Sequence, residues 1–242
     1  MNKIAIVTGG SSGIGLAITK RLLGEHYRVF NLDISPSDIG DYIYCDVSKV
    51  FEVERAINSV IEVAGRIDVL VSNAGVHLSA NIEQTSEAEL DMIFSLNVKG
   101  AYAAIKSSLS QMKKQAAGVI ILISSDQALV GKPNSFAYNL SKAALASIAK
   151  TTALDYAAYN IRVNAVCPGT IDTPLYHRAI NNYCDKSGAD KTTVHKEEAA
   201  LQPLGRIGQP EEVANLVAFL VSEQAQFITG SLQLIDGGYT AR

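Results

Sequence analysis

The sequence predicts an α/β protein built on one doubly wound parallel sheet of about seven strands, with helices on both faces. Two observations support this fold class. Short apolar runs with little polar–apolar alternation recur along the chain, which is typical of strands covered on both faces. Longer stretches with helical spacing of apolar residues separate most of these runs. Strand–helix alternation over the whole length favours a single parallel sheet.

The expected strands are short runs rich in Val, Ile and Leu. In chain order they are Ile4–Thr8, Arg28–Leu32, Tyr42–Cys45, Val69–Ser72, Val119–Ser124, Arg162–Val166 and Leu232–Ile235. The expected helices are longer, with apolar residues three or four positions apart. They are Ile14–Gly24, Val50–Ala64, Leu90–Lys114, Phe136–Tyr159 and Glu211–Ser222. Because ligands of parallel sheets bind at the carboxyl ends of the strands, we expect functional residues just after each strand.

Two segments interrupt the alternation. Residues Ile34–Asp41 contain Pro36 and Gly40 and are too few for a helix. Residues Thr173–Pro203 are polar, rich in small residues and without a strand pattern, so we expect a long loop that serves as a substrate lid at about residues 173–203. No repeat or linker divides the chain, and we expect one cofactor-binding and catalytic domain over residues 1–242.

Composition narrows the functional classes. Apolar residues make up 48% of the chain and charged residues 19%, as in globular proteins. The formal charge is −3 and the cations are scattered, which argues against nucleic-acid or anionic-membrane partners. Neither a signal peptide nor a membrane-length apolar run is apparent, and three distant cysteines suit reduced thiols better than a disulfide framework. We therefore expect a cytoplasmic protein with a small-molecule partner.

A glycine-rich turn follows the first expected strand and leads into the first helix. It reads Thr8-Gly9-Gly10-Ser11-Ser12-Gly13-Ile14-Gly15. Glycines here allow a tight turn and let backbone N–H groups approach a pyrophosphate, while the helix N-terminus adds partial positive charge. The spacing is G-x-x-x-G-x-G and differs from the common G-x-G-x-x-G fingerprint. We expect a dinucleotide phosphate site at this turn.

The second expected strand leads into Asp33, about twenty positions beyond the glycines. A carboxylate at this place can accept hydrogen bonds from the adenosine ribose hydroxyls and repels the 2′-phosphate of NADP. No arginine follows it, and Ser12 in the glycine turn is not basic. These features favour NAD over NADP as the cofactor.

Several further motifs occur in a fixed order, and with them the chain resembles the short-chain dehydrogenase/reductase family, in its single-domain branch of about 250 residues. The motifs are Thr8-Gly9-x-x-x-Gly13-Ile14-Gly15, Asp46-Val47, Ser72-Asn73-Ala74-Gly75, Asn97, the set Ser125, Tyr138 and Lys142, Pro168-Gly169-x-x-x-Thr173, and Asp236-Gly237-Gly238. The resemblance implies a Rossmann-type fold and a nicotinamide cofactor. The cofactor contacts implied are Gly9, Ser11, Ser12, Gly13, Ile14, Gly15, Asp33, Asp46, Val47, Asn73, Ala74, Gly75, Tyr138, Lys142, Pro168, Gly169, Ile171 and Thr173.

The active-site chemistry can also be read from the residues. Tyr138 and Lys142 are four positions apart on a helical pattern and so share one face. The nearby ammonium and an oxidised nicotinamide ring favour the phenolate, so we expect the tyrosine pKa to fall toward the working pH. Ser125 follows the fifth strand and can hydrogen-bond the substrate oxygen. The resemblance implies that Tyr138 is the general acid/base, that Lys142 also holds the nicotinamide ribose, that Ser125 orients the substrate, and that Asn97 supports a water relay.

The chain also departs from the family pattern. Leu140 stands where the family motif Tyr-x-Ala-Ser-Lys has Ala. Asp126 follows Ser125 where a small residue is common, and we expect a solvated loop carboxylate there, with a substrate contact as the alternative. Together with the short connection after Asp33, this Ser-Asp pair is similar to dihydrodiol dehydrogenases. We expect His77 to be structural and not catalytic.

Substrate contacts are expected from the lid and from the loop after the fifth strand. The candidates are Gln127, Asn134, Tyr176, His177 and Arg178. No pair of the four histidines has the spacing of metal ligands, so no metal is expected. The family resemblance implies a homotetramer or homodimer, and the small stripe of Ala143, Ala144, Ser147 and Thr151 is consistent with close helix packing between subunits.

The leading hypothesis is an NAD(H)-dependent oxidoreductase that moves a hydride between nicotinamide and a small secondary alcohol or ketone, cyclic or polyol-like. One alternative is a 3-oxoacyl-[acyl-carrier-protein] reductase that uses NADPH, against which Asp33 argues. Another is a dehydrogenase of the 2,3-dihydro-2,3-dihydroxybenzoate type. A non-catalytic dinucleotide-sensing protein is the most distant alternative, because such proteins typically lack the active-site Tyr or Lys.

Overall fold

The computed structural model describes residues 2–241, except for the side chain of Lys186. Seven parallel strands form one sheet in the order β3-β2-β1-β4-β5-β6-β7. The strands are β1 (Ile4–Thr8), β2 (Arg28–Asp33), β3 (Asp41–Tyr44), β4 (Val69–Ser72), β5 (Gly118–Ile123), β6 (Ile161–Pro168) and β7 (Leu232–Ile235). The predicted fold class is confirmed, and every strand end lies within two residues of its expected place.

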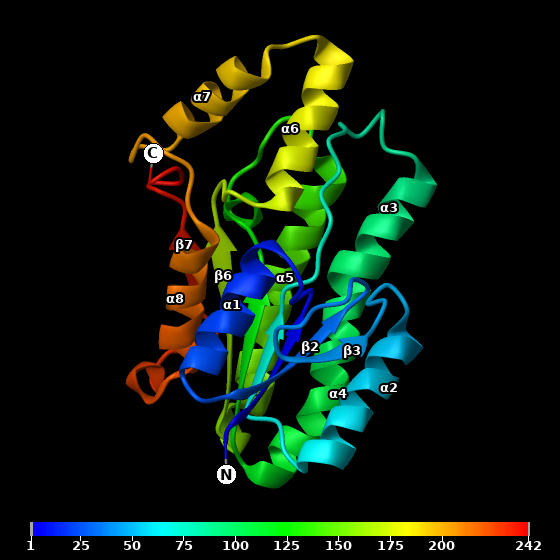
Figure 1. The fold of residues 1–242 in the computed structure, drawn as a ribbon, viewed down its shortest axis with the longest axis vertical. Helices are drawn as coiled ribbons and strands as arrows, with labels where there is room; N and C mark the ends of the chain where they lie inside the picture. The colour runs from blue at the N-terminus through cyan, green and yellow to red at the C-terminus, as the bar shows by residue number, and fades with distance from the viewer. Residues whose placement is uncertain (1, 242) are drawn as a thin grey trace.

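Helices cover both faces of the sheet (Figure 1). On one face α1 (Gly13–Gly24) packs against α8 (Pro210–Val221). The other face carries α2 (Val50–Ala64), α4 (Gly100–Gln115) and α5 (Phe136–Tyr156). The strand order reverses between β1 and β4, and in such sheets the crevice outside the carboxyl ends of the strands is the ligand site.

The interior strand β1 shows why the strands lack polar–apolar alternation. Along β1, Ile4 and Ile6 pack into the apolar cluster shared with α2, α4 and α5, whereas Ala5 and Val7 pack into the cluster shared with α1 and α8. Successive side chains of a strand point to opposite faces. Both faces are covered, so every residue of β1 is buried and apolar side chains are favoured throughout.

The helix predicted over Leu90–Lys114 is interrupted. The structure begins with α3 (Glu87–Ile93), continues as a π-helical segment over Phe94–Lys99 and then enters α4. Ser86 and Glu89 form a capping box that fixes the start, three residues before the predicted one. The helix predicted to end at Tyr159 ends at Tyr156 and continues as a short 3₁₀ turn.

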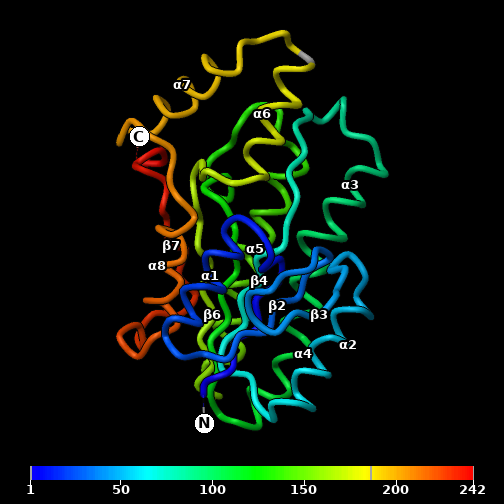
Figure 2. The backbone as a smooth tube through the Cα atoms, in the orientation of Figure 1, coloured from blue at the N-terminus to red at the C-terminus, as the bar shows by residue number. Residues whose placement is uncertain are grey.

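The lid was expected to be a loop, and this expectation is wrong. It forms two helices, α6 (Pro174–Ser187) and α7 (Lys191–Leu201), which lie beyond the carboxyl ends of the strands (Figure 2). The hydroxyl of Thr173 accepts a 3.2 Å hydrogen bond from the N–H of Tyr176 and caps α6. The carboxylate of Asp190 accepts from Thr193 N–H at 2.8 Å and caps α7. These end caps stabilise helices whose own residues are largely polar.

The connection Ile34–Asp41 contains no helix, as predicted. Gly40 has a φ of 77°, in the region that glycine adopts without strain. Among residues 2–241, none of the helices has the length and apolar character needed to cross a bilayer.

Candidate active site

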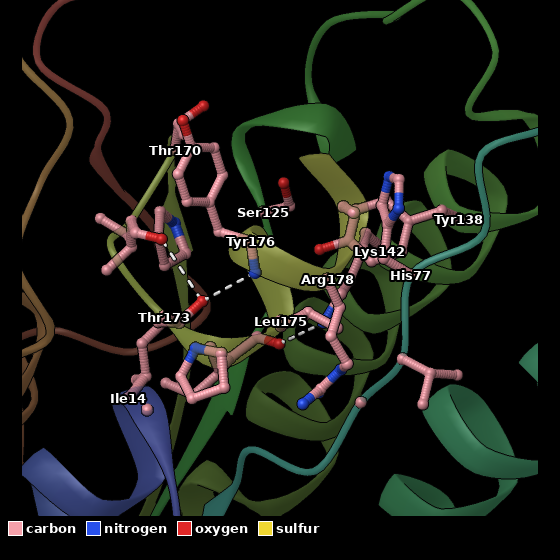
Figure 3. A pocket seen from close by; sticks show the side chains of 18 of the residues that line it. Ile14, His77, Ser125, Tyr138, Lys142, Thr170, Thr173, Leu175, Tyr176 and Arg178 are labelled. Atoms are coloured by element: carbon pink, nitrogen blue, oxygen red, sulfur yellow. Dashed lines mark hydrogen bonds between the residues drawn. The ribbon is translucent and has the colours of Figure 1, made fainter. Parts of the chain in front are cut away.

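A cavity of about 1060 Å³ opens at the carboxyl ends of the strands. Its walls combine the glycine turn, the ends of β2, β4, β5 and β6, the first turns of α5 and the lid helices. Figure 3 shows side chains from several of these elements turned toward one another. The place agrees with the expectation that ligand-binding residues follow the strands.

The glycine turn forms one end of the cavity. Gly9 has a φ of 67° and Gly13 a φ of 51°, conformations that favour glycine. A Cβ on Gly9 would lie 2.9 Å from the Cα of Ala74, so the turn can approach the β4 loop only without a side chain. Ser12 is the N-cap of α1 but makes no side-chain cap. The first N–H groups of α1 are thus free of a side-chain cap beside the cavity, as a pyrophosphate site requires.

Asp33 lines the same end of the cavity. One carboxylate oxygen accepts from the N–H of Ser11 at 3.0 Å, and the other accepts from the N–H of Ser35 at 2.9 Å. The hydroxyl of Ser11 donates to Ser35 O at 2.7 Å and accepts from the buried Asn31 amide at 3.0 Å. Each carboxylate oxygen retains a lone pair, so Asp33 is held in place with capacity for further donors.

The residues expected beside the adenine and the pyrophosphate line the cavity as well. Asp46 and Val47 follow β3, and the Asp46 carboxylate accepts from both the N–H and the hydroxyl of Ser48. These bonds hold the pKa of Asp46 below its usual value. The Asn73 amide donates to Thr8 O and Gly9 O, each at 3.0 Å. Asn73 therefore ties the loop after β4 to the glycine turn.

At the other end, Tyr138 and Lys142 extend from α5 and Ser125 follows β5. The Lys142 Nζ lies 5.5 Å from the centroid of the Tyr138 ring and donates to the carbonyl of Ile123 at 2.9 Å. The Ser125 hydroxyl accepts from Gln127 N–H at 3.2 Å. The structure thus brings together the three side chains that the sequence singled out (Figure 3).

The pKa of Tyr138 differs from the sequence-based expectation. Burial raises it well above the usual value, and the charge of Asp126 adds to that effect, while a hydrogen bond with Ser125 opposes it. The expected fall in this pKa is therefore not found in the protein alone. Burial also lowers the pKa of Lys142, to about 8. Both shifts have one physical cause, because a low-dielectric wall disfavours the charged form of each group.

Asn97 lies in the π-helical segment and is almost fully buried. Its amide oxygen accepts from Val76 N–H at 2.9 Å, and its amide nitrogen donates to Val76 O and to the Ser141 hydroxyl, each at 3.0 Å. A Cβ on Gly75 would lie 3.4 Å from the Asn97 oxygen and 3.5 Å from Lys142 Nζ. Asn97 therefore holds the backbone of the cavity wall next to Lys142 without lining the cavity itself.

The loop after β6 and the lid complete the cavity. Pro168, Gly169, Ile171 and Thr173 all line it, as expected of the nicotinamide side. Four of the five candidate substrate contacts also line it: Gln127, Asn134, Tyr176 and Arg178.

His177 is the exception, since its ring nitrogen Nε2 bonds the Asp172 carboxylate at 2.7 Å outside the wall. Ser11, Gly15 and Asn97 likewise stand behind the wall that the described residues form.

No group of three or more His, Cys, Asp or Glu among residues 2–241 is arranged to hold a metal ion.

The structure adds to the sequence-based expectations for two residues. His77 was expected to be structural and not catalytic, and its ring lies edge-on to Tyr138 with centroids 4.7 Å apart, in the wall of the cavity. Burial, with Lys132 and Lys142 nearby, lowers its pKa to about 4, so the imidazole is neutral at pH 7. Asp126 was expected to be solvated, but it is buried beside Ser125 in the same wall. The sequence signal for a place in the active site was the position of Asp126 directly after Ser125.

Comparisons with known proteins agree with this geometry. Residues 9–240 match the family model described as enoyl-(acyl carrier protein) reductase. The cyclopentanol dehydrogenase of Comamonas testosteroni is 34% identical, over 99% of this chain and 98% of the relative. The ligand-free aldohexose dehydrogenase of Thermoplasma acidophilum superposes with a TM-score of 0.94 at 40% identity, covering 100% of this chain and 95% of the other. The structure of ElxO with NADP bound gives a TM-score of 0.90 at 30% identity, with both chains fully covered.

Proposed function

The chain belongs to the short-chain dehydrogenase/reductase family of oxidoreductases, and on this premise we propose that it is an NAD(H)-dependent dehydrogenase of a small secondary alcohol. The observation that carries the proposal is one cavity with an uncapped helix N-terminus at one end and Tyr138, Lys142 and Ser125 at the other. We further propose that residues 1–242 act as one unit and that residues 173–203 close over the substrate.

In the proposed mechanism the nicotinamide supplies the hydride chemistry. Tyr138 takes the proton of the substrate hydroxyl during oxidation and returns it during reduction. Lys142, 5.5 Å from the Tyr138 ring, stabilises the phenolate that burial otherwise disfavours. Ser125 holds the substrate oxygen while negative charge develops on it. Asn97 fixes the backbone next to Lys142 and supports the path by which a proton returns to solvent.

The choice of NAD rests on Asp33 and on the distribution of cations. Asp33 carries a negative charge beside the expected adenosine ribose, where a 2′-phosphate would meet it. The Lys and Arg side chains of the cavity wall are Lys132, Lys142 and Arg178, which come from the loop after β5, from α5 and from α6 at the other end. The ElxO structure has NADP bound, so the cofactor preference of this chain is the property to measure first.

A substrate panel tests the proposal. Secondary alcohols, including cyclopentanol and aldohexoses, are offered with NAD and then with NADP, and nicotinamide reduction is followed by absorbance. We expect turnover of at least one secondary alcohol and a higher kcat/KM with NAD. A strong preference for NADPH together with 3-oxoacyl thioesters would instead support a 3-oxoacyl-[acyl-carrier-protein] reductase, the activity named for a Thermotoga maritima relative that is 34% identical to this chain. Failure of the whole panel with both cofactors would refute the dehydrogenase.

We also propose a homotetramer built partly through α4 and α5. Support comes from apolar side chains exposed on these helices, such as Leu154 (81% exposed) on α5 and Tyr102 (49%) on α4. Ala143, Ser147 and Thr151 of the small-residue stripe are exposed on α5 too, so the stripe is free to contact another subunit. Light scattering coupled to gel filtration measures the mass, for which we expect four times that of the chain.

A further inference from the structure

The one proton of the Ser125 hydroxyl is already engaged. Ser125 Oγ donates to Oδ1 of Asp126 at 2.8 Å, and the same oxygen accepts from Gln127 N–H. The dehydrogenase proposed above needs this proton for the substrate oxygen, where negative charge develops. While Asp126 is its acceptor, Ser125 has no donor to offer. A substrate must therefore displace Ser125 from Asp126, or react without its help.

Asp126 is built to face a ligand. Its side chain is 6% exposed, yet it lines the cavity beside Ser125. The nearby cation Lys132 is engaged elsewhere, with its Nζ 3.1 Å from both carboxylate oxygens of Glu198. A buried carboxylate without a matched cation is costly unless hydrogen-bond donors surround it. The Ser125 hydroxyl and the Gln127 N–H already hydrogen-bond the Asp126 carboxylate, and the cavity is the side from which a ligand can supply a further donor.

Resting on the proposed dehydrogenase function, we propose that Asp126 accepts a hydrogen bond from a second hydroxyl of the substrate, on the carbon next to the reacting one. Two hydroxyls on neighbouring carbons lie about one hydrogen-bond length apart, which matches the 2.8 Å between Ser125 Oγ and Asp126 Oδ1. A vicinal diol can therefore reach both side chains at once.

The second hydroxyl changes what Ser125 can do. When it takes the place of the Ser125 hydroxyl at Oδ1 of Asp126, the Ser125 proton is released and turns to the reacting oxygen. A matching mono-alcohol leaves Ser125 bound to Asp126 and loses this stabilisation in the transition state. The selection therefore acts on kcat as well as on KM, which a simple binding contact would not do. The substrate class is a vicinal diol or polyol in oxidation and an α-hydroxy ketone in reduction.

The test compares paired substrates that differ by one hydroxyl. The pairs are cis-1,2-cyclohexanediol with cyclohexanol, cis-1,2-cyclopentanediol with cyclopentanol, and 2,3-butanediol with 2-butanol, each with NAD and NADP. A hydrogen bond to a charged group corresponds to a preference of about 10- to 100-fold in kcat/KM for the diol. In Asp126→Ala we expect the preference to fall to within about threefold.

Two further variants distinguish a specific role of Asp126 from a general loss of folding or of charge. Asp126→Asn retains an acceptor of the same size without the charge, so we expect an intermediate preference even if the alanine variant fails to fold. Asp68→Asn is the matched control: it removes the same charge at the amino end of β4, where Asp68 binds the N–H of Ile4 at 2.7 Å. We expect it to leave the diol preference unchanged.

The results separate this inference from the proposed function. Equal turnover of diols and mono-alcohols by the wild type, or an undiminished preference in Asp126→Ala, would overturn the role of Asp126 and leave the dehydrogenase intact. Preference for the protonated amine trans-2-aminocyclohexanol over the diol would also overturn it, by showing that Asp126 binds a cation. Turnover of no alcohol in any pair would refute the dehydrogenase itself.

Discussion

Tyr138 experiences two opposing effects on one phenol. Burial raises its pKa and the charge of Asp126 adds to this effect, whereas an ammonium at Lys142, 5.5 Å from the ring centroid, favours the phenolate. Both effects act on the proton of the phenol, and neither involves the glycine turn at the other end of the cavity. Loss of the phenol oxygen should therefore separate chemistry from cofactor binding.

In Tyr138→Phe we expect kcat to fall by about 10³-fold, because the only group proposed to exchange the substrate proton is removed. The phenylalanine ring retains the edge contact with His77, so the dissociation constant for NADH, followed by fluorescence, should stay within about threefold. Tyr102→Phe on the exposed face of α4 is the control. Near-normal turnover in Tyr138→Phe would show that another group moves the proton.

Asp33 carries the prediction on cofactor choice. In Asp33→Asn the size and the acceptor for Ser11 N–H remain, while the charge that repels a 2′-phosphate is lost. We expect the ratio of kcat/KM for NAD to that for NADP to fall about 10-fold or more, measured by initial rates. Asp33→Ala should move the ratio in the same direction. If both variants still reject NADP, some other residue reads the ribose.

At the scale of the element, an ion pair joins the lid to the body of the protein. Lys132, in the loop before α5, holds Glu198 of α7 through two 3.1 Å contacts, with the two side chains 31% and 19% exposed. Exposed pairs contribute only about 0–1 kcal/mol. This partly buried pair joins α7 to the loop after β5, so its loss should act locally.

In Lys132→Met we expect hydrogen exchange of the backbone amides of residues 191–201 to accelerate by about three- to tenfold, because α7 opens more often. The melting temperature should shift little, since the sheet and both apolar clusters are unchanged. Lys196→Met, on α7 itself, is the matched control. Equal exchange rates in Lys132→Met and the wild type would show that other contacts hold α7.

The elements show what sequence reasoning can and cannot supply. The strands were predictable because burial on both faces leaves a near-continuous apolar signal, as in β1. The lid helices were missed because α6 and α7 are polar on average, and α7 also lacks a marked apolar face. Their ends were nevertheless marked in the sequence: Thr173-Pro174 has the form of an N-cap followed by proline at N1, and Gly188 sits at the C-cap.

Only some features of the candidate site could be predicted from the sequence. The glycine turn and the set of Ser125, Tyr138 and Lys142 were predictable because their chemistry requires fixed spacing along the chain. The surroundings of Asp126 and His77 were not, because the groups around them come from other segments: Tyr138 packs edge-on to His77, and the charge of Lys132 acts on both residues. Whether a carboxylate is solvated or enclosed is a property of the folded chain.

At the scale of the whole molecule, a buried lysine makes stability depend on pH. The pKa of Lys142 falls from 10.5 to about 8 on folding, because burial disfavours the ammonium. Between pH 8 and 10.5 the unfolded chain therefore binds more protons at this residue than the native one. The free energy of unfolding that depends on Lys142 thus rises with pH through this window, and below pH 8 its penalty is constant.

Comparison with Lys142→Met isolates this effect from the other titrating groups. From pH 7 to pH 10 we expect the wild type to gain on the order of 2 kcal/mol in unfolding free energy relative to the variant. Urea denaturation of both proteins at the two pH values measures the difference. If the difference between them is the same at both pH values, Lys142 titrates alike in the folded and unfolded chains.

The two lid helices follow β6, whereas Ser125 and Asp126 lie in the segment between β5 and α5, and Tyr138 and Lys142 lie in α5. Substitutions in α6 and α7 can therefore change the size and shape of the substrate pocket while the residues that transfer the proton stay the same. A lineage built on this scaffold can diversify in the size of what it oxidises and still inherit an unchanged demand for neighbouring hydroxyls.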